Sequence, residues 1–161
     1  MKKILITGGC GFIGSNFINY YFYKNKNVEM INLDAMYYCA NENNILEEIR
    51  NSDRYKLIKG NLCSFDLLNH ILSNFNIDTV IHFAAQSHVQ NSFSDSFRYT
   101  NDNILGTHTL LKASLKYFET LNGFEKDNFR YIQISTDEVY GSLKDKDPQS
   151  SENSPYFPNS P

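Results

Sequence analysis

The sequence of 161 residues has little cysteine, little excess charge and no long apolar run. Its three cysteines, Cys10, Cys39 and Cys63, are odd in number and widely spaced, which favours free thiols in a reducing compartment over a disulfide framework. No apolar stretch approaches the roughly 20 residues of a membrane helix, and the apolar start of the chain is too short for a signal peptide. We therefore expect a cytoplasmic protein that does not enter the membrane.

The charge pattern gives no sign of a basic binding surface. The net charge is −3, and cations gather only in the short Lys24–Lys26 pair. Nucleic acid and anionic lipid are bound by clustered Lys and Arg, so we expect neither as a partner. The length suits one domain, which we expect to span residues 1–161.

Short strand-like segments alternate with longer helical ones. Most strand candidates are nearly continuously apolar, as parallel strands buried on both faces should be; they are Lys3–Thr7, Val28–Leu33, Tyr55–Lys59, Thr79–Phe83 and Phe129–Ser135. The helix candidates are Phe12–Tyr23, Asn43–Asn51, Phe65–Asn74 and Tyr99–Phe118. This alternation predicts an α/β fold with a doubly wound parallel sheet of the Rossmann type. A polar loop with several prolines should follow Tyr140 and run to Pro161.

Glycines cluster directly after the first expected strand. Gly9, Gly11 and Gly14 satisfy Gly-x-Gly-x-x-Gly, and a second reading with the same last two glycines begins at Gly8. Such glycines permit a tight turn, close approach of backbone amides to a pyrophosphate, and close packing of helix on strand. The run therefore predicts a dinucleotide phosphate site at a helix N-terminus, with an ordinary glycine turn as the alternative.

An acidic residue ends the second expected strand. Asp34 lies 20 residues after Gly14, where a carboxylate would accept hydrogen bonds from the hydroxyls of an adenosine ribose. The same charge would repel a 2′-phosphate, which favours NAD over NADP. The alternative is that Asp34 is a turn or capping residue.

The carboxyl ends of the fourth and fifth strands carry the remaining candidate chemistry, because ligands of open α/β sheets bind at this edge. Ala84 and Ala85 follow the fourth strand and would let a cofactor lie against the backbone. Asp137 and Glu138 follow the fifth strand, where adjacent side chains would point to opposite faces. Both would face one substrate only if the strand breaks into a turn there, which Gly141 permits. The pair could supply a general acid and a general base, or be an ordinary acidic loop.

Histidine and cysteine give no pattern typical of a metal site. His82 and His88 have no established ligand spacing and no cysteine or acid cluster completes them, so we expect structural roles and no bound metal. Cys10 stands at an expected helix N-terminus, which would lower its pKa. The alternative is that Cys10 is a small residue beside the pyrophosphate.

Taken together, these motifs resemble the extended short-chain dehydrogenase/reductases. The segments that carry the resemblance are Thr7–Gly14, Asn32–Asp34, Phe83–Val89, Asn103–Thr107 and Ser135–Gly141. More narrowly, Thr-Asp-Glu-Val-Tyr-Gly at 136–141 resembles the dTDP-glucose 4,6-dehydratases and their UDP-glucose-using relatives, lyases of deoxysugar and rhamnose biosynthesis. Related epimerases carry Ser-Ala-Thr-type residues at this place, and decarboxylases and GDP-mannose dehydratases typically carry Thr-Ser-Glu.

The resemblance implies NAD as cofactor and assigns residues by position. The expected cofactor-binding residues are Gly8, Gly11, Phe12, Ile13, Gly14, Asp34, Ala35, Met36, Tyr37, Asn61, Leu62, Phe83, Ala84, Ala85, Gln86, Ser87 and Thr100. Ser87 and Thr136 would touch the hexose of a nucleotide-sugar substrate. Asp137 would give a proton to the departing C6 hydroxyl, and Glu138 would remove the C5 proton.

The sequence departs from the family pattern in several places. Asn61 stands where Asp is usual, Ala35 replaces a common Lys, and Gln90 replaces a common Asp. The Tyr-x-x-x-Lys pair of the family would begin directly after Pro161, and the sugar-nucleotide domain would lie further on. We therefore expect a truncated form that is inactive alone.

Three questions stay open at this point. An epimerase or decarboxylase of the same superfamily is the alternative enzyme, and an inert NAD-binding module is the alternative outside enzymes. The base of the nucleotide, thymine or uracil, is not determined. Leu110, Leu111, Leu115 and Phe118 align with a helix that family members use in dimers, so we expect a homodimer of the full-length protein.

Overall fold

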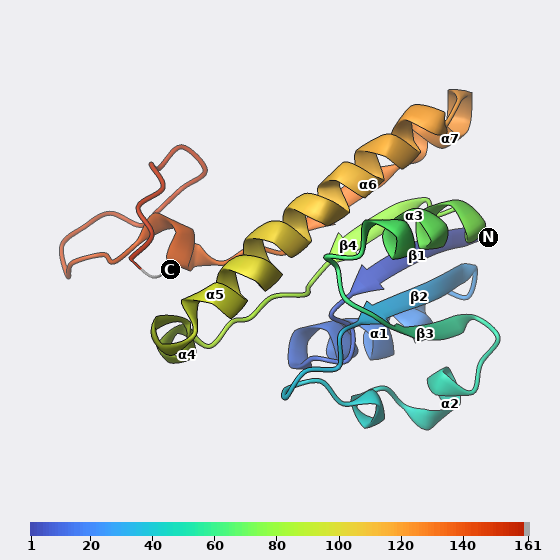
Figure 1. Cartoon of the computed structure of the whole chain (residues 1–161), viewed down its shortest axis with the longest axis horizontal. Coiled ribbons are helices and arrows are strands. Elements are labelled where there is room, and N and C mark those ends of the chain that lie inside the picture. The colour runs from blue at the N-terminus through green and yellow to red at the C-terminus, as the bar shows by residue number, and fades with distance from the viewer. Residues whose placement is uncertain (160–161) are drawn as a thin grey trace.

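A parallel sheet of five strands forms the centre of the computed structural model, which describes residues 1–159 (Figure 1). The strands are β1 (Lys2–Thr7), β2 (Val28–Asp34), β3 (Tyr55–Lys59), β4 (Thr79–His82) and β5 (Arg130–Gln133). Their order is β3-β2-β1-β4-β5, and every neighbouring pair is parallel. The strand order reverses between β1 and β4. The carboxyl ends of these two strands are therefore the switch point of a doubly wound sheet. The predicted Rossmann-type fold is confirmed.

Helices cover both faces of the sheet. The longer ones are α1 (Phe12–Lys24), α3 (Phe65–Asn74) and α6 (Gly106–Thr120). The shorter elements are η1 (Glu42–Asn44), α2 (Glu47–Arg50), α4 (Val89–Ser94), α5 (Ser96–Tyr99), η2 (Thr100–Leu105), α7 (Gly123–Asn128) and η3 (Asp137–Tyr140). Within residues 1–159 no helix is both long and apolar enough to cross a membrane.

Alternate residues of β1 fill two separate cores. Leu5 packs on the face covered by α3 and α6, with Leu68, Ile71, Leu72, Leu110 and Ala113. Ile4 and Ile6 pack on the opposite face, covered by α1, with Ile18 and Phe22. Because successive side chains of a strand point to opposite faces, an almost wholly apolar strand is what two covered faces require. Figure 1 shows α3 and α6 on one side of the strands.

The predicted helix Asn43–Asn51 is wrong, because the chain is extended in its middle. Ile45 has φ −92° and ψ 129°, so the segment divides into η1 and α2. The side chain of Asn19, on α1, explains the break. Its amide donates to the carbonyl of Asn44 at 2.8 Å and accepts from the backbone N–H of Leu46 at 3.1 Å. These side-chain bonds replace those of a continuous helix.

The predicted helix Tyr99–Phe118 begins earlier and is less regular than expected. α5, the π-helical segment η2 and α6 follow one another directly from Ser96 to Thr120. The short helices α4 and α7 were not predicted. Between Gly141 and Asn159 the described chain has turns and no helix or strand, as expected of the loop, whose last residues, 160 and 161, lie outside the described part.

Candidate functional site

The glycine loop joins β1 to α1 with little room to spare. Gly8 has φ +72°, and a Cβ there would lie 2.6 Å from the backbone N and Cα of Ala84, after β4. A Cβ on Gly14 would overlap the carbonyl oxygen of Gly8. At Gly11, by contrast, the nearest atom to a Cβ is 3.4 Å away, and the next residues, Phe12 and Ile13, are exposed. The loop is therefore tight toward the sheet and open above the N-terminus of α1, the side from which an anion would approach.

Asp34 lies beside this loop, as the spacing predicts. It is 7% exposed, and its two carboxylate oxygens accept from the backbone N–H of Cys10 at 2.9 Å and of Met36 at 2.8 Å. The second bond closes an Asx turn that holds Met36 at φ +57°, an unusual value for a residue other than glycine. Asp34 is thus also a turn residue, and each oxygen keeps a further lone pair for a ribose hydroxyl.

The thiol of Cys10 is buried, not activated. Its side chain is 0% exposed and its sulfur accepts from the amide of Asn32 at 3.4 Å. Burial, and then the negative charge of Asp34, raise the pKa of Cys10 to about 11. The expectation of a lowered pKa at a helix N-terminus is therefore wrong, because burial removes the hydration that a thiolate needs. A small buried residue is part of the alternative; that Cys10 lies beside a pyrophosphate stays a prediction.

The side chains after β2, β3 and β4 meet in one polar cluster. Asn61 donates to the hydroxyl of Tyr37 at 2.8 Å, and Gln86 donates through Nε2 to the carboxylate of Asp102 at 2.8 Å. The Tyr37 hydroxyl reaches the same carboxylate at 3.5 Å. Burial, and then the charge of Asp102, raise the pKa of Tyr37, so its hydroxyl stays protonated and can donate. The fold brings these three expected cofactor residues together around an acid that the sequence reasoning did not single out.

The other expected cofactor residues lie along the same edge of the sheet with different exposures. Phe83 packs against Phe17 of α1, with ring centroids 5.3 Å apart. Leu62 belongs to the hydrophobic core. Ala35 and Ala84 are half-buried, whereas Ala85, Ser87 and Thr100 are exposed.

His82 is a buried link between three elements. It is 0% exposed, and its two ring nitrogens lie 2.6 Å from the hydroxyl of Thr7, on β1, and 2.9 Å from that of Thr107, on α6. Burial lowers the pKa of His82 to about 4, so the ring is neutral near pH 7. Among the described residues no group of three or more His, Cys, Asp and Glu side chains is arranged to hold a metal ion.

The acidic pair after β5 lies on a turn, as predicted. Asp137–Tyr140 forms the 3₁₀ turn η3, and the hydroxyl of Thr136 accepts from the backbone N–H of Glu138 at 3.2 Å and contacts the Asp137 carboxylate at 3.4 Å. A cavity of about 700 Å³ opens beside it, lined by Ser135, Thr136, Asp137, Val139, Tyr140, Tyr156 and Pro158. Among the residues that the structure describes, Glu138 and Ser87 do not line this cavity. The cavity is large enough for a hexose.

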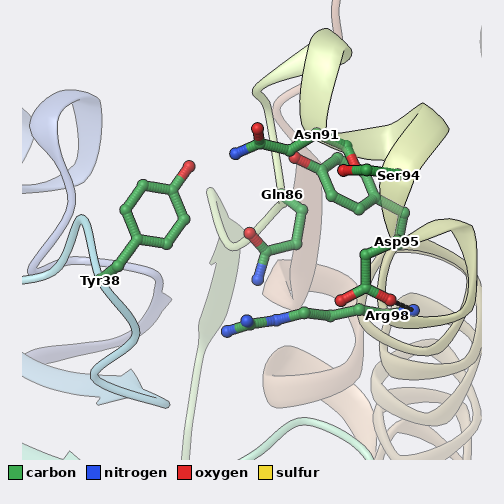
Figure 2. A pocket seen from close by; sticks show the side chains of 7 residues that line it. Tyr38, Gln86, Asn91, Ser94, Asp95 and Arg98 are labelled. Carbon is green, nitrogen blue, oxygen red and sulfur yellow. Dashed lines mark hydrogen bonds between the residues drawn. The ribbon is translucent and has the colours of Figure 1, made fainter.

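A smaller cavity of about 180 Å³ lies between the loop after β2 and helices α4 and α5; it is lined by Tyr38, Gln86, Asn91, Ser94, Asp95, Arg98 and Tyr99 (Figure 2). In Figure 2, Tyr38 stands on one side of the gap, and the side chains of Gln86 and Arg98 point toward it from the other. Arg98 was not predicted as a site residue. Its spacing to Asp102, four positions along a helical segment, is a charge pattern that the sequence does display.

The parallel sheet, the glycine loop and the acid at the end of β2 define a Rossmann-type dinucleotide-binding domain. The chain belongs to the GDP-mannose 4,6 dehydratase family, whose model matches residues 5–161. It is 42% identical to a dTDP-glucose 4,6-dehydratase of Haemophilus influenzae over 161 residues, which are 100% of this chain and 47% of that protein. It is 45% identical to the dTDP-D-glucose 4,6-dehydratase of Dictyostelium discoideum, covering 91% of this chain and 32% of that protein.

Solved structures give the same result. The dTDP-glucose 4,6-dehydratase of Bacillus anthracis in complex with NAD matches with a TM-score of 0.83 and 35% identity, over 100% of this chain and 45% of that one. The dTDP-glucose 4,6-dehydratase DesIV of Streptomyces venezuelae, with NAD and TYD bound, matches with a TM-score of 0.84 and 33% identity, over 98% and 46%. The chain therefore spans about a third to a half of the length of the relatives named here. The resemblance to dTDP-glucose 4,6-dehydratases is confirmed.

Proposed function

We propose that the full-length protein is an NAD-dependent nucleotide-sugar 4,6-dehydratase that converts dTDP-glucose, or alternatively UDP-glucose, to the 4-keto-6-deoxy sugar and water. The observation that carries the proposal is the Asp137–Glu138 turn at the carboxyl end of β5, beside a cavity of about 700 Å³. Within the family, Asp137 is the residue that favours dTDP-glucose-type chemistry over the Thr-Ser-Glu pattern of GDP-mannose dehydratases. The relatives named above support the same activity.

The residues present fit NAD. The open backbone around Gly11 would receive the pyrophosphate, and the Asp34 carboxylate, fixed by two backbone N–H groups, would receive the adenosine ribose hydroxyls. When bound, NAD would take up a hydride from C4 of the sugar and return it to C6. Both solved dTDP-glucose 4,6-dehydratases named above hold NAD, which supports the choice.

The residues of the turn divide the proton transfers between them. Asp137 lines the cavity and would donate a proton to the departing C6 hydroxyl, while Glu138 would remove the proton from C5. Thr136, whose hydroxyl contacts the Asp137 carboxylate and the backbone N–H of Glu138, would fix the turn and bind the hexose together with Ser87. Glu138 is not among the residues that line the cavity, so it would have to turn toward the sugar when the sugar binds.

The test is a product assay on the full-length protein with dTDP-glucose and UDP-glucose in parallel. Loss of one water, detected by mass spectrometry as a decrease of 18 mass units expected for any dehydration, would support the proposal, and the faster substrate would identify the base. An epimer of unchanged mass would favour the epimerase alternative. Absence of any reaction while NAD binds would favour an inert NAD-binding module.

We further propose a cytoplasmic homodimer. Of the four side chains expected on this helix, Leu111 and Leu115 are exposed, Phe118 is half-buried and Leu110 is buried in the core. Phe93 and Phe97, on α4 and α5, are also exposed, and exposed apolar side chains of this kind pack in helical dimer interfaces. The three free cysteines suit a reducing compartment. Light scattering of the full-length protein should give twice the monomer mass, and a monomer would contradict the assembly.

A further inference from the structure

The carboxylate of Asp102 contacts residues that follow strands on both sides of the switch point between β1 and β4. In the order β3-β2-β1-β4-β5, Tyr37 and Asn61 follow strands on one side of β1, and Gln86 follows β4 on the other. Asp102 itself comes from η2. A ligand of an open α/β sheet binds in the crevice at this switch point. A residue that bonds to both walls of that crevice can fix its width.

Asp102 contacts both walls, and its bond to Gln86 is the shorter of the two. Oδ2 accepts from Nε2 of Gln86 at 2.8 Å, and Oδ1 is reached by the Tyr37 hydroxyl at 3.5 Å. The side chain of Asp102 is only 11% exposed, so its charge needs partners within the protein. The Gln86 backbone is also fixed, because its N–H donates to the side chain of Asn103 at 2.7 Å and its carbonyl accepts from that side chain at 3.0 Å.

Arg98 completes the arrangement from one helical turn earlier. Its Nε lies 3.8 Å from Oδ2 of Asp102, and its guanidinium carbon is 4.4 Å from the centre of the Tyr37 ring. The guanidinium thus neutralises the acid and covers the ring at the same time. Tyr37, three residues after Asp34, is therefore held at its hydroxyl by Asn61 and Asp102 and at its ring by Arg98.

We propose that Asp102 is a positioning residue for the adenosine half of the dinucleotide site. Through Gln86, Tyr37 and Arg98 it holds the segments after β4 and β2 at a fixed separation before the nucleotide binds. The inference rests on the proposed NAD-dependent function. Because the acid acts through other residues, its loss should reduce nucleotide affinity by removing preorganisation, without removing a direct contact.

The experiment is calorimetry on the full-length protein with NAD and, separately, with ADP as a probe of the adenosine half. Asp102→Asn keeps the size of the side chain and removes its charge. We expect both nucleotides to bind about 10-fold more weakly, the effect of losing one hydrogen bond to a charged group. Arg98→Lys, which keeps the charge and loses the planar contact with Tyr37, should give a smaller loss in the same direction.

A double-mutant cycle separates positioning from general destabilisation. Tyr37→Phe combined with Asp102→Asn should lose less affinity than the two single losses together, because both act through one network. Asp66→Asn removes an exposed acid from the first turn of α3 and serves as the control, with unchanged affinity.

The possible outcomes distinguish the two proposals. If Asp102→Asn lowers the melting temperature and leaves both affinities unchanged, or weakens NAD but not ADP, the positioning role is overturned. If the unaltered protein binds neither nucleotide, the proposed NAD-dependent function fails instead.

Discussion

Strands β2 and β5 differ sharply in burial. All residues of β2 except Glu29 are buried, and the strand pairs with β1 and β3. β5 pairs only with β4 among the described residues, and Arg130, Ile132 and Gln133 are exposed. Figure 1 shows the chain after β5 standing clear of the sheet. The proposed dinucleotide half is therefore fixed by a packed core, whereas the proposed dehydration turn is held mainly by its own local hydrogen bonds.

The largest predicted change is in turnover, and it should come from substitutions in the turn after β5, although this region contributes least to the core. In the full-length protein, Asp137→Asn or Glu138→Gln should slow turnover by about 10²- to 10⁴-fold, the usual consequence of losing a positioned acid or base. NAD should still be reduced, because hydride removal precedes elimination, so NADH absorbance should rise transiently after mixing with the substrate. Both side chains are exposed, and the melting temperature should therefore stay unchanged. Turnover at the unaltered rate in either variant would show that the pair is an ordinary acidic loop.

The difference in packing can be measured directly with two matched substitutions. Ile6 on β1 is 0% exposed, whereas Ile132 on β5 is 44% exposed. Ile6→Ala should lower the free energy of unfolding by about 2–5 kcal/mol, through lost burial and the cavity left behind. Ile132→Ala in the 161-residue chain should cost under about 1 kcal/mol, as expected of an exposed position. Urea unfolding would measure both, and equal costs would contradict the contrast.

The same pair of substitutions sharpens the comparison in the full-length protein. A larger cost of Ile132→Ala there than in the 161-residue chain would show that further residues cover β5. An equal cost would show that this face stays exposed.

His82 lies on β4, between β2 and β5 in the order of the sheet, and should make stability depend on pH. Its pKa is about 4 in the folded protein and near 6.5 when unfolded, so the unfolded state binds more protons between these values. The contribution of the neutral, buried His82 ring to the free energy of unfolding is fully present above pH 6.5. It is lost as the pH falls toward 4, by up to about 3 kcal/mol. Urea titrations at pH 7 and pH 5 should show this decrease. His82→Gln should flatten this pH dependence, whereas His70→Gln, at an exposed position, should leave it unchanged. An equal dependence on pH in the unaltered protein and both variants would refute the lowered pKa of His82.

Local patterns were enough to predict the strands, the glycine loop and the turn at Asp137. Each depends on residues close together in the sequence: apolar runs for β1 and β2, Gly8 to Gly14 for the loop, and adjacent acids before Gly141 for the turn. The position of Asp34 beside the loop also followed, because one βα unit separates them.

The features that the sequence did not predict depend on distant partners. The helix expected at Asn43–Asn51 is interrupted by Asn19, and Asp102 meets Tyr37 65 positions away and Gln86 16 positions away. The pKa of Cys10 depends on how deeply the fold buries the thiol. None of these distances can be read from a propensity or a spacing.

The smallest effect should come from the best-packed half, at Asp34. Its carboxylate accepts two backbone N–H groups, so Asp34→Asn, which retains one carbonyl acceptor, is a milder change than Asp34→Ala. Removal of the charge should weaken NAD and relieve the repulsion of a 2′-phosphate, narrowing the preference for NAD over NADP by about 10-fold, or about 1.4 kcal/mol. Asp34→Ala should narrow it similarly and also lower the melting temperature, since the buried N–H of Cys10 and the part-buried N–H of Met36 lose their partner. Calorimetry with both cofactors on the full-length protein would measure the ratio. Tighter binding of NADP than of NAD by the unaltered protein would contradict the role of Asp34, and with it the view that the packed half of the molecule selects the cofactor.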